Sequence, residues 1–248
     1  MSDVDRVVEA LRRAATVTAL TGAGVSAASG VPTFRGGNGL WRNVRAETLA
    51  TSAAFQRDPR LVWEWYDWRR QMIAAAQPNA AHQVLARWSQ QRPGFTLITQ
   101  NVDGLHERAG AERLIGLHGS IWSLRCWNAC EADRGGWLDD RAPLPSLPPR
   151  CPSCGGLARP GVVWFGEGLN PDHVDHATRA AGCDVFLTIG TSAVVYPAAG
   201  LIPRARAQGA LTIEINPDAT GATGGVDIVL RGPAEAVLAD IDGKLREA

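Results

Sequence analysis

Several features that would place a protein outside the ordinary globular class are missing here. No apolar run approaches the roughly 20 residues that a membrane-spanning helix needs. Lys+Arg and Asp+Glu are 25 each, so the chain lacks the positive excess of a strongly basic nucleic-acid binder. Residues 1–6 lack the apolar stretch of a signal peptide and carry acids that a transit peptide avoids. We therefore expect a cytoplasmic protein that binds neither membranes nor nucleic acid directly.

Cysteine is also scarce, and its placement is informative. A chain of 248 residues that is 45% hydrophobic can bury a core without disulfides. Four of the five cysteines form two close pairs, Cys126/Cys130 and Cys151/Cys154. In a reducing compartment such pairs indicate tetrahedral zinc, and four thiolates leave no open position for a substrate. We predict one structural Zn²⁺, and we expect the fifth cysteine, Cys183, to be inert core.

Short apolar runs alternate with amphipathic stretches, which is typical of an α/β fold with a largely parallel sheet. Asp58 followed by Pro59 predicts a helix start, and Asn79 predicts another. Strands are expected at 16–20, 95–99, 114–117, 185–189, 211–215 and 226–230. Helices are expected at about 58–76, from 79, and at about 171–181, 197–208 and 233–246.

Two stretches interrupt the alternation. Residues 36–78 form a Trp-rich, mostly helical insertion, and residues 122–160 contain the paired cysteines and a proline-rich run. The second segment has too little apolar periodicity to build a core alone, so it needs a staple such as a metal. We predict a single catalytic domain, 1–248, whose Rossmann-like, doubly wound lobe comprises about 1–35, 79–121 and 161–248. The helical insertion and a smaller zinc-binding module complete it.

A glycine-rich turn follows the first expected strand. Gly22, Gly24 and Ala27 match the G-x-G-x-x-G/A pattern, in which glycine lets the backbone approach a pyrophosphate. An ordinary tight turn explains the same residues. A dehydrogenase would carry an acid at the end of a second strand about 20 residues on. No strand ends in an acid there, which argues against an ordinary Rossmann dehydrogenase.

Polar residues follow several other expected strands. These are Gln100–Asp103, His118 and Gly190–Ser192. Doubly wound sheets bind ligands at the carboxyl ends of their strands, and an imidazole there is a plausible general base. Turn chemistry accounts for any one of these loops but less easily for the series. His82 and His106 lie in predicted helices and are weaker candidates, and we expect His173 and His176 to be solvated.

Five segments, taken in order, resemble the signature of the sirtuin family over nearly the whole chain. They are Gly22–Gly36 (GAGVSAASGVPTFRG), Thr99–His106 (TQNVDGLH), Leu117–Gly119 (LHG), Arg159–Glu167 (RPGVVWFGE) and Gly190–Ser192 (GTS). The spacing of Cys126 and Cys130 departs from the usual C-x2-C by one residue. That departure concerns which atoms of the turn bind zinc and not whether the site exists.

The resemblance implies removal of acyl groups from protein lysines with NAD as co-substrate, releasing nicotinamide and O-acyl-ADP-ribose. It implies that His118 acts as base on a ribose hydroxyl. Acylated lysines of protein substrates would enter between the lobes, beside Val162, Trp164 and Phe165. The residues implied to bind NAD are Gly22, Ala23, Gly24, Ser26, Phe34, Arg35, Trp41, Gln100, Asn101, Asp103, Gly190, Thr191, Ser192, Asn216, Asp218 and Ala234.

Within the family, the chain resembles the branch that removes succinyl and malonyl groups. That branch carries Tyr-x-x-Arg, matched by Tyr66 and Arg69, and small residues matched by Ala46 and Ala50. Spacing of three places Tyr66 and Arg69 on one helix face. The resemblance favours a receptor for an acyl carboxylate. Without it, a packed tyrosine beside an arginine with a buried stem explains the pair.

Two other functions remain open at this point. The chain could act mainly as a deacetylase on the same fold. It could instead be a zinc-ribbon interaction module that binds NAD as a signal. Nicotinamide release that depends on an acylated peptide would separate the enzymes from the sensor.

Overall fold

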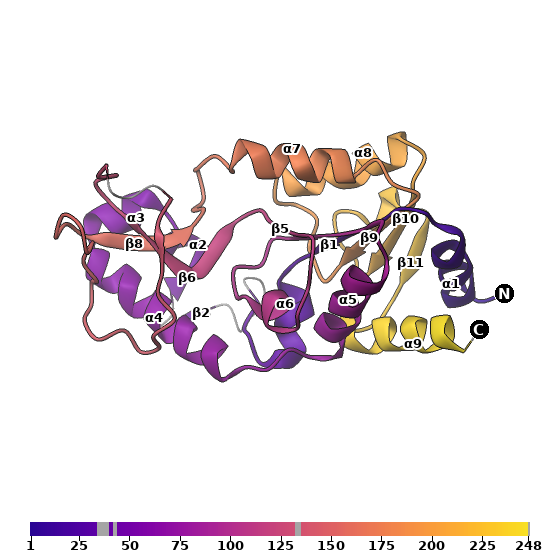
Figure 1. Cartoon of the computed structure of the whole chain (residues 1–248), viewed down its shortest axis with the longest axis horizontal. Helices are drawn as coiled ribbons and strands as arrows, with labels where there is room; N and C mark the ends of the chain where they lie inside the picture. Colours follow the sequence, from indigo (N-terminus) through magenta and orange to yellow (C-terminus); the bar gives the residue numbers. More distant parts are fainter. Residues whose placement is uncertain (34–39, 42–43, 132–134, 248) are drawn as a thin grey trace.

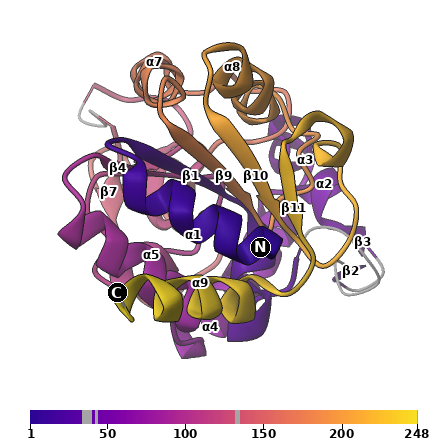
Figure 2. The same cartoon turned by 90° about the vertical axis from the view of Figure 1, so that its right-hand side faces the viewer.

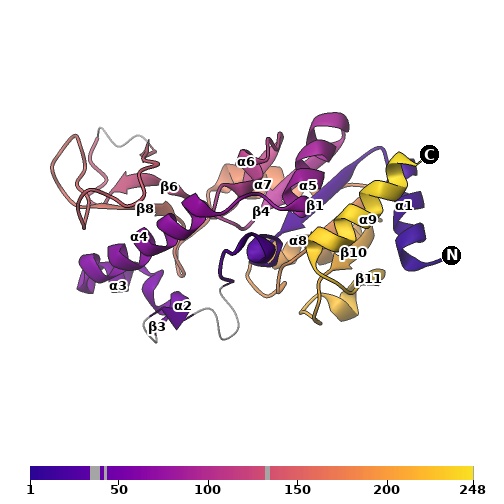
Figure 3. The ribbon, with the colours of Figure 1, turned by 90° about the horizontal axis from the view of Figure 1, so that it is seen from below.

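The protein consists of a larger lobe built on a parallel sheet and a smaller lobe beside it (Figure 1). The computed structural model describes residues 1–33, 40–41, 44–131 and 135–247. Seen from below, the molecule is elongated, with the small lobe at one end and helices α1 and α9 at the other (Figure 3). No helix among these residues combines the length and apolar character that crossing a bilayer requires.

Six parallel strands form the large sheet in the order β11-β10-β9-β1-β4-β5. They are β1 (Val17–Thr21), β4 (Phe95–Thr99), β5 (Leu114–Gly116), β9 (Val185–Ile189), β10 (Leu211–Ile215) and β11 (Ile228–Leu230). The sequence predicted three of them to the residue, and β1, β5 and β11 differ from expectation by one or two residues. β1 lies between β4 and β9, so the strand order reverses there and the α/β prediction is confirmed.

Helices cover both faces of this sheet (Figure 2). α1 (Asp3–Arg13), α5 (Ala80–Gln91) and α9 (Ala234–Arg246) lie on one face, and α7 (Pro171–Ala180) and α8 (Leu201–Ala207) on the other. Successive strand residues point to opposite faces of the sheet. Ala19 and Leu97 pack in the cluster beneath α1, α5 and α9, whereas Leu20 and Ile98 pack in the cluster beneath α7 and α8. Strands buried on both faces need continuous apolar runs, which is the pattern in the sequence.

The small lobe combines the helical insertion with an antiparallel sheet. Its helices are α2 (Ala46–Leu49), α3 (Ser52–Arg57) and α4 (Pro59–Ala75). Its strands are β6 (Gly119–Cys126), β7 (Trp137–Leu138) and β8 (Ala158–Val162), in the order β7-β6-β8. β6 begins before residue 122 and β8 ends after residue 160, so both strands cross the boundaries that we predicted for a zinc module.

Short elements complete the chain. They are η1 (Ala23–Ser29), the β2 (Leu40–Trp41) and β3 (Val44–Arg45) pair, α6 (Leu105–Arg108), η3 (Ala198–Gly200) and η4 (Thr223–Gly225). The helix starts follow local chemistry: Asp58 accepts a hydrogen bond from Leu61 N at 2.9 Å, and Asn79 accepts one from Ala81 N at 2.9 Å. The predicted caps of α4 and α5 are thereby confirmed.

A buried arginine fastens α4 to the small sheet. The guanidinium of Arg70 is fully buried and donates to Ile121 O at 2.6 Å, Asp139 O at 2.5 Å and Arg141 O at 3.0 Å. It also lies 5.1 Å from the centroid of the Trp122 ring. The two terminal nitrogens of this buried guanidinium thus bind three carbonyl groups, which orients α4 on β6, whereas Nε has no hydrogen-bond partner in the described part of the chain.

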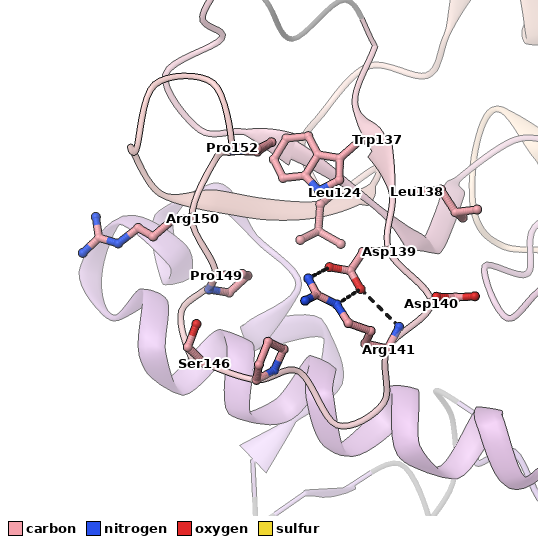
Figure 4. A pocket seen from close by; sticks show the side chains of 11 residues that line it. Leu124, Trp137, Leu138, Asp139, Asp140, Arg141, Ser146, Pro149, Arg150 and Pro152 are labelled. Carbon is pink, nitrogen blue, oxygen red and sulfur yellow. Dashed lines mark hydrogen bonds and ion pairs between the residues drawn. The ribbon is translucent and has the colours of Figure 1, made fainter.

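A hollow of about 560 Å³ opens on the small lobe between β7 and the proline-rich segment (Figure 4). Trp137, Pro149 and Pro152 line it, and Arg141 pairs with the Asp139 carboxylate at 2.5 Å. Of the residues that the sequence assigned to NAD, acyl-lysine or zinc, none of those that the structure describes lines this hollow.

Candidate active site

The loops after β1 and β9 pack tightly, and this explains the glycine pattern. Gly22 N donates to Ile189 O at 3.1 Å, and Gly24 N donates to Gly190 O at 2.8 Å. A Cβ on Gly24 would lie 2.7 Å from Gly190 O, and one on Gly22 would lie 2.7 Å from Thr191 Cβ. A side chain at either position would force the two strand ends apart, so glycine is required here for packing.

Amide side chains from the loop after β4 donate hydrogen bonds to the two packed loops that follow β1 and β9. Gln100 Nε2 donates to Thr191 Oγ1 at 3.0 Å, and Asn101 Nδ2 donates to Gly22 O at 3.1 Å. Asn216, after β10, donates from Nδ2 to Thr191 O at 3.3 Å. The carboxyl ends of β1, β4, β9 and β10 therefore meet at one polar edge, where a doubly wound sheet binds its ligand.

His118 follows β5 at this edge. Its Nδ1 lies 2.9 Å from Gln100 O, and since a carbonyl only accepts, Nδ1 carries the proton and Nε2 keeps its lone pair. Burial lowers the pKa of His118, and the bond to Gln100 opposes that shift. The ring is thus neutral at physiological pH and half-buried, as a general base must be.

A buried chain of hydrogen bonds lies behind the edge, and sequence reasoning did not find it. Asn79 N donates to His82 Nδ1 at 3.3 Å, so His82 Nε2 carries the proton and faces Ser26 Oγ at 3.3 Å. Ser26 Oγ in turn donates to Asp103 Oδ2 at 2.7 Å. Each donor has one acceptor, so Ser26 and the Asp103 carboxylate are held in fixed orientations.

His106 lies next to this chain. Its ring centroid is 4.9 Å from that of His82, and Nε2 lies 3.0 Å from Thr21 Oγ1. Burial lowers the pKa of His82 to about 4 and that of His106 to about 3, so both rings are neutral. The apolar neighbours of His82 on its helix, Ala81 and Leu85, were the available signal that it faces the core.

The remaining histidines lie outside the site. His176 is exposed, as expected. The expectation was wrong for His173, which is half-buried and donates from Nδ1 to Gly116 O at 2.8 Å.

The other residues assigned to NAD differ in burial. Ala23 and Ser192 are half-buried, and Ala234 is the buried first residue of α9. Asp218 is exposed, and its carbonyl accepts from Arg231 at 2.6 Å. Phe34 and Arg35 lie outside the described residues, as does the side chain of Trp41.

The four paired cysteines come together in the small lobe. Their Sγ atoms all lie within 4.8 Å of one another. The Cys126–Cys154 separation of 3.5 Å and the Cys130–Cys151 separation of 3.8 Å are too long for disulfides. Tetrahedral zinc with bonds of about 2.3 Å places its sulfurs about 3.8 Å apart. The donor set and its spacing fit one structural Zn²⁺, despite the C-x3-C spacing.

Five of the residues assigned to acyl recognition form part of one buried cluster. Ala46, Ala50, Tyr66, Val162 and Trp164 belong to it. Arg69 is 6% exposed, and its guanidinium lies 5.5 Å from the centroid of the Trp65 ring. Phe165, by contrast, is 48% exposed.

The Sir2 family model matches residues 22–197, which include the glycine turn, His118 and the four cysteines. The chain belongs to the Sir2 family. An NAD-dependent protein deacylase of Aquifex aeolicus is 50% identical over 232 residues, covering 93% of this chain and 95% of that protein. NAD-dependent protein deacylase 1 of Archaeoglobus fulgidus is 46% identical over 245 residues, 98% of each chain.

Solved Sir2 structures share the fold over nearly the whole chain. A Sir2 homologue in complex with NAD is 46% identical, with a TM-score of 0.92, and covers 98% of this chain and 94% of its own. A mutant homologue bound to 2′-O-acetyl ADP-ribose is 45% identical, also with a TM-score of 0.92. It covers 100% of this chain and 97% of its own.

Proposed function

We propose that this Sir2-family chain is an NAD-dependent protein-lysine deacylase. The observation that carries the proposal is the polar edge, where His118, Asn101 and Asp103 gather beside the packed loops after β1 and β9. Bound NAD would supply the electrophilic ribose carbon that the acyl oxygen attacks. Gly22–Ser26 and Asn101–Asp103 would hold its nicotinamide side, and Gly190–Ser192, with Asn216, Asp218 and Ala234, its adenosine side.

The chain's own residues fit that role chemically. A neutral His118 with a free lone pair on Nε2 can take a proton from a hydroxyl group. The Asp103 carboxylate is held by Ser26 Oγ at 2.7 Å and by Leu105 N at 2.9 Å, so it is placed before any ligand arrives. Such prior placement lowers the ordering cost of binding.

We propose further that the preferred acyl groups are succinyl and malonyl. Arg69 offers a planar fork of N–H donors that matches a carboxylate, and Tyr66 adds a hydroxyl. Burial lowers the pKa of Arg69, because a cation loses solvation there. An acidic acyl group would compensate for that loss, whereas an acetyl group would not. Small side chains at Ala46 and Ala50 would leave room for the longer chain.

The test compares kcat/KM for succinyl, malonyl and acetyl peptides with NAD. A charged hydrogen bond contributes about 1.5–3 kcal/mol, so the wild type should favour the acidic groups by roughly ten- to hundred-fold. Arg69→Met keeps the apolar stem and removes the fork. It should cost most of the succinyl activity and spare the acetyl activity.

The control variant is Arg60→Met on the same helix, where the arginine is exposed and pairs with Glu64 at 3.2 Å. It should leave both activities unchanged. If Arg69→Met lowers both activities by one factor, Arg69 is structural and a deacetylase is the better description. If NAD binds but no peptide releases nicotinamide, the chain is an NAD-binding module and not an enzyme.

A further inference from the structure

Tyr66, which the proposed function assigns to an acyl carboxylate, is hydrogen-bonded to a buried tryptophan. Trp164 Nε1 lies 2.9 Å from the Tyr66 hydroxyl, and both side chains are buried. An indole N–H can only donate, so the Tyr66 oxygen is the acceptor. Arg69 is also a donor only. The phenol proton therefore points to a group other than these two residues.

The proton is retained on the phenol under ordinary conditions. Burial raises the pKa of Tyr66, although the bond from Trp164 and the charge of Arg69 oppose that shift. Because Tyr66 keeps its proton and its oxygen already accepts a hydrogen bond from Trp164, its O–H is available to donate a hydrogen bond to an anion.

The indole is clamped on several sides. The Arg159 guanidinium lies 3.6 Å from the ring centroid of Trp164 and pairs with Glu167 through contacts of 2.6 and 2.8 Å. Glu167 also accepts from Trp164 N at 2.9 Å and from Ser52 Oγ at 2.9 Å. The ring of Phe55 also packs against Trp164, with 5.3 Å between the two ring centroids. With 1% of its surface exposed, Trp164 cannot reorient without disturbing this network.

We propose that Trp164 is a positioning residue for acyl selectivity: its N–H occupies the Tyr66 oxygen and so fixes the phenol as donor toward a substrate carboxylate. This inference rests on the proposed preference for acidic acyl groups. It assigns Trp164 a role exerted through Tyr66, since the buried indole offers almost no surface to an incoming peptide. The Arg159–Glu167 pair sets the direction of the indole.

Trp164→Phe tests the inference, because it keeps an aromatic ring and removes the N–H. A neutral hydrogen bond corresponds to about a three- to tenfold effect, so kcat/KM for the succinyl peptide should fall by that factor, mainly through KM. Activity on the acetyl peptide should fall by a smaller factor than activity on the succinyl peptide, so the succinyl-to-acetyl ratio decreases. Tyr66→Phe should lower the succinyl-to-acetyl ratio by at least as much.

The double variant gives the decisive comparison. If Trp164 acts through the Tyr66 hydroxyl, Trp164→Phe should have no further effect on selectivity in the Tyr66→Phe background. A drop of the same factor in both backgrounds would overturn the inference, because the indole would then act by packing alone.

A matched control is Trp63→Phe. Trp63 is buried in the same cluster, but its N–H donates to Ala158 O at 2.7 Å. This variant should lower thermal stability without changing the selectivity ratio, and an equal loss of selectivity would contradict the inference. If Trp164→Phe does not fold, Glu167→Gln loosens the clamp instead and should lower the ratio in the same direction. An unchanged ratio there would overturn the inference.

The Tyr66→Phe variant separates failure of the proposed acyl preference from failure of the role proposed for Trp164. If Tyr66→Phe leaves the ratio unchanged, the carboxylate receptor itself is wrong, and the role of Trp164 is refuted with it. If Tyr66→Phe lowers the ratio and Trp164→Phe does not, the receptor stands and only the role of Trp164 is refuted.

Discussion

His118 illustrates how a single hydrogen bond selects a chemical role. Its bond to Gln100 O leaves Nε2 unprotonated, and burial keeps the ring neutral. The same ring exposed to solvent would be protonated more often near neutral pH, since an ordinary histidine titrates at about 6.5. The carbonyl after β4 therefore decides the tautomer of the side chain after β5.

We predict that His118→Ala lowers deacylation by at least about 100-fold and leaves the Kd for NAD within a few-fold. A general base acts on the reacting group and need not contribute to ground-state binding. Peptide turnover and calorimetric titration with NAD measure the two quantities. Turnover close to the wild-type rate would remove His118 from the mechanism.

The pH profile of the wild type provides an independent check on the same residue. Because the pKa of His118 lies below its ordinary value, the base remains active as pH falls to about 6.5 and loses activity only below that. An acidic limb centred well above pH 7 would mean that another group is titrating.

Residues of helix α4 contact both the buried aromatic cluster and the small sheet. Tyr66 belongs to the buried cluster that also contains Trp164, while Arg70 donates to carbonyls of β6 and of the segment after β7. Asp67, between them, accepts from Leu144 N at 2.7 Å. Different positions of this helix therefore carry the proposed acyl receptor and fasten the small sheet, so disturbing that sheet should also disturb selectivity.

The four-cysteine site is the second feature, after Arg70, that we expect to stabilise the small lobe. We predict that Cys154→Ala loses the metal and lowers the melting temperature by about 10 °C or more, since a structural zinc contributes directly to folding. Metal analysis of the purified protein and a thermal scan measure the two effects together. Cys183→Ser is the control: its sulfur lies 3.3 Å from Val185 O, in the large lobe, and zinc content should be unchanged. A wild-type protein without zinc would refute the assignment.

At the scale of the molecule, the core formed by the described residues is divided into three clusters. Two lie on opposite faces of the large sheet, and the third joins the helical insertion to the small sheet. The polar edge lies where loops from several strands of the large sheet meet, beside the small lobe. A ligand at this edge would contact loops that are far apart in the sequence.

We predict that NAD at about 100 times its Kd stabilises the protein by about 2.7 kcal/mol, because it binds the folded state alone. For a chain of this length that corresponds to a rise in melting temperature of about 5–10 °C. Thermal scans with increasing NAD measure the shift. ATP, which lacks the nicotinamide ribose, should produce a smaller rise, and no shift with saturating NAD would contradict the assignment of the edge.

Much of the fold followed from the sequence. Apolar runs and capping residues located the strands and helices of the large lobe, because these signals are local. The spacing of the four cysteines predicted a cluster that the structure confirms. The role of His118 as a base, inferred from its position after a strand and from the family motif, stays a prediction. The sequence did not predict the hydrogen-bonded chain of Asn79, His82, Ser26 and Asp103. These residues come from three separate segments, and whether they form hydrogen bonds depends on the distances between their atoms in the folded protein.

The sequence by itself determined the alternation of elements, the four thiolates and the family motifs, since each rests on neighbours along the chain. Only the tertiary structure decided that Trp164 donates to Tyr66, that Arg70 fastens α4 to β6, and that Gly24 packs against Gly190. These contacts join residues 51 to 166 positions apart, and hydrogen bonds and close packing depend on atomic separations that no local pattern encodes.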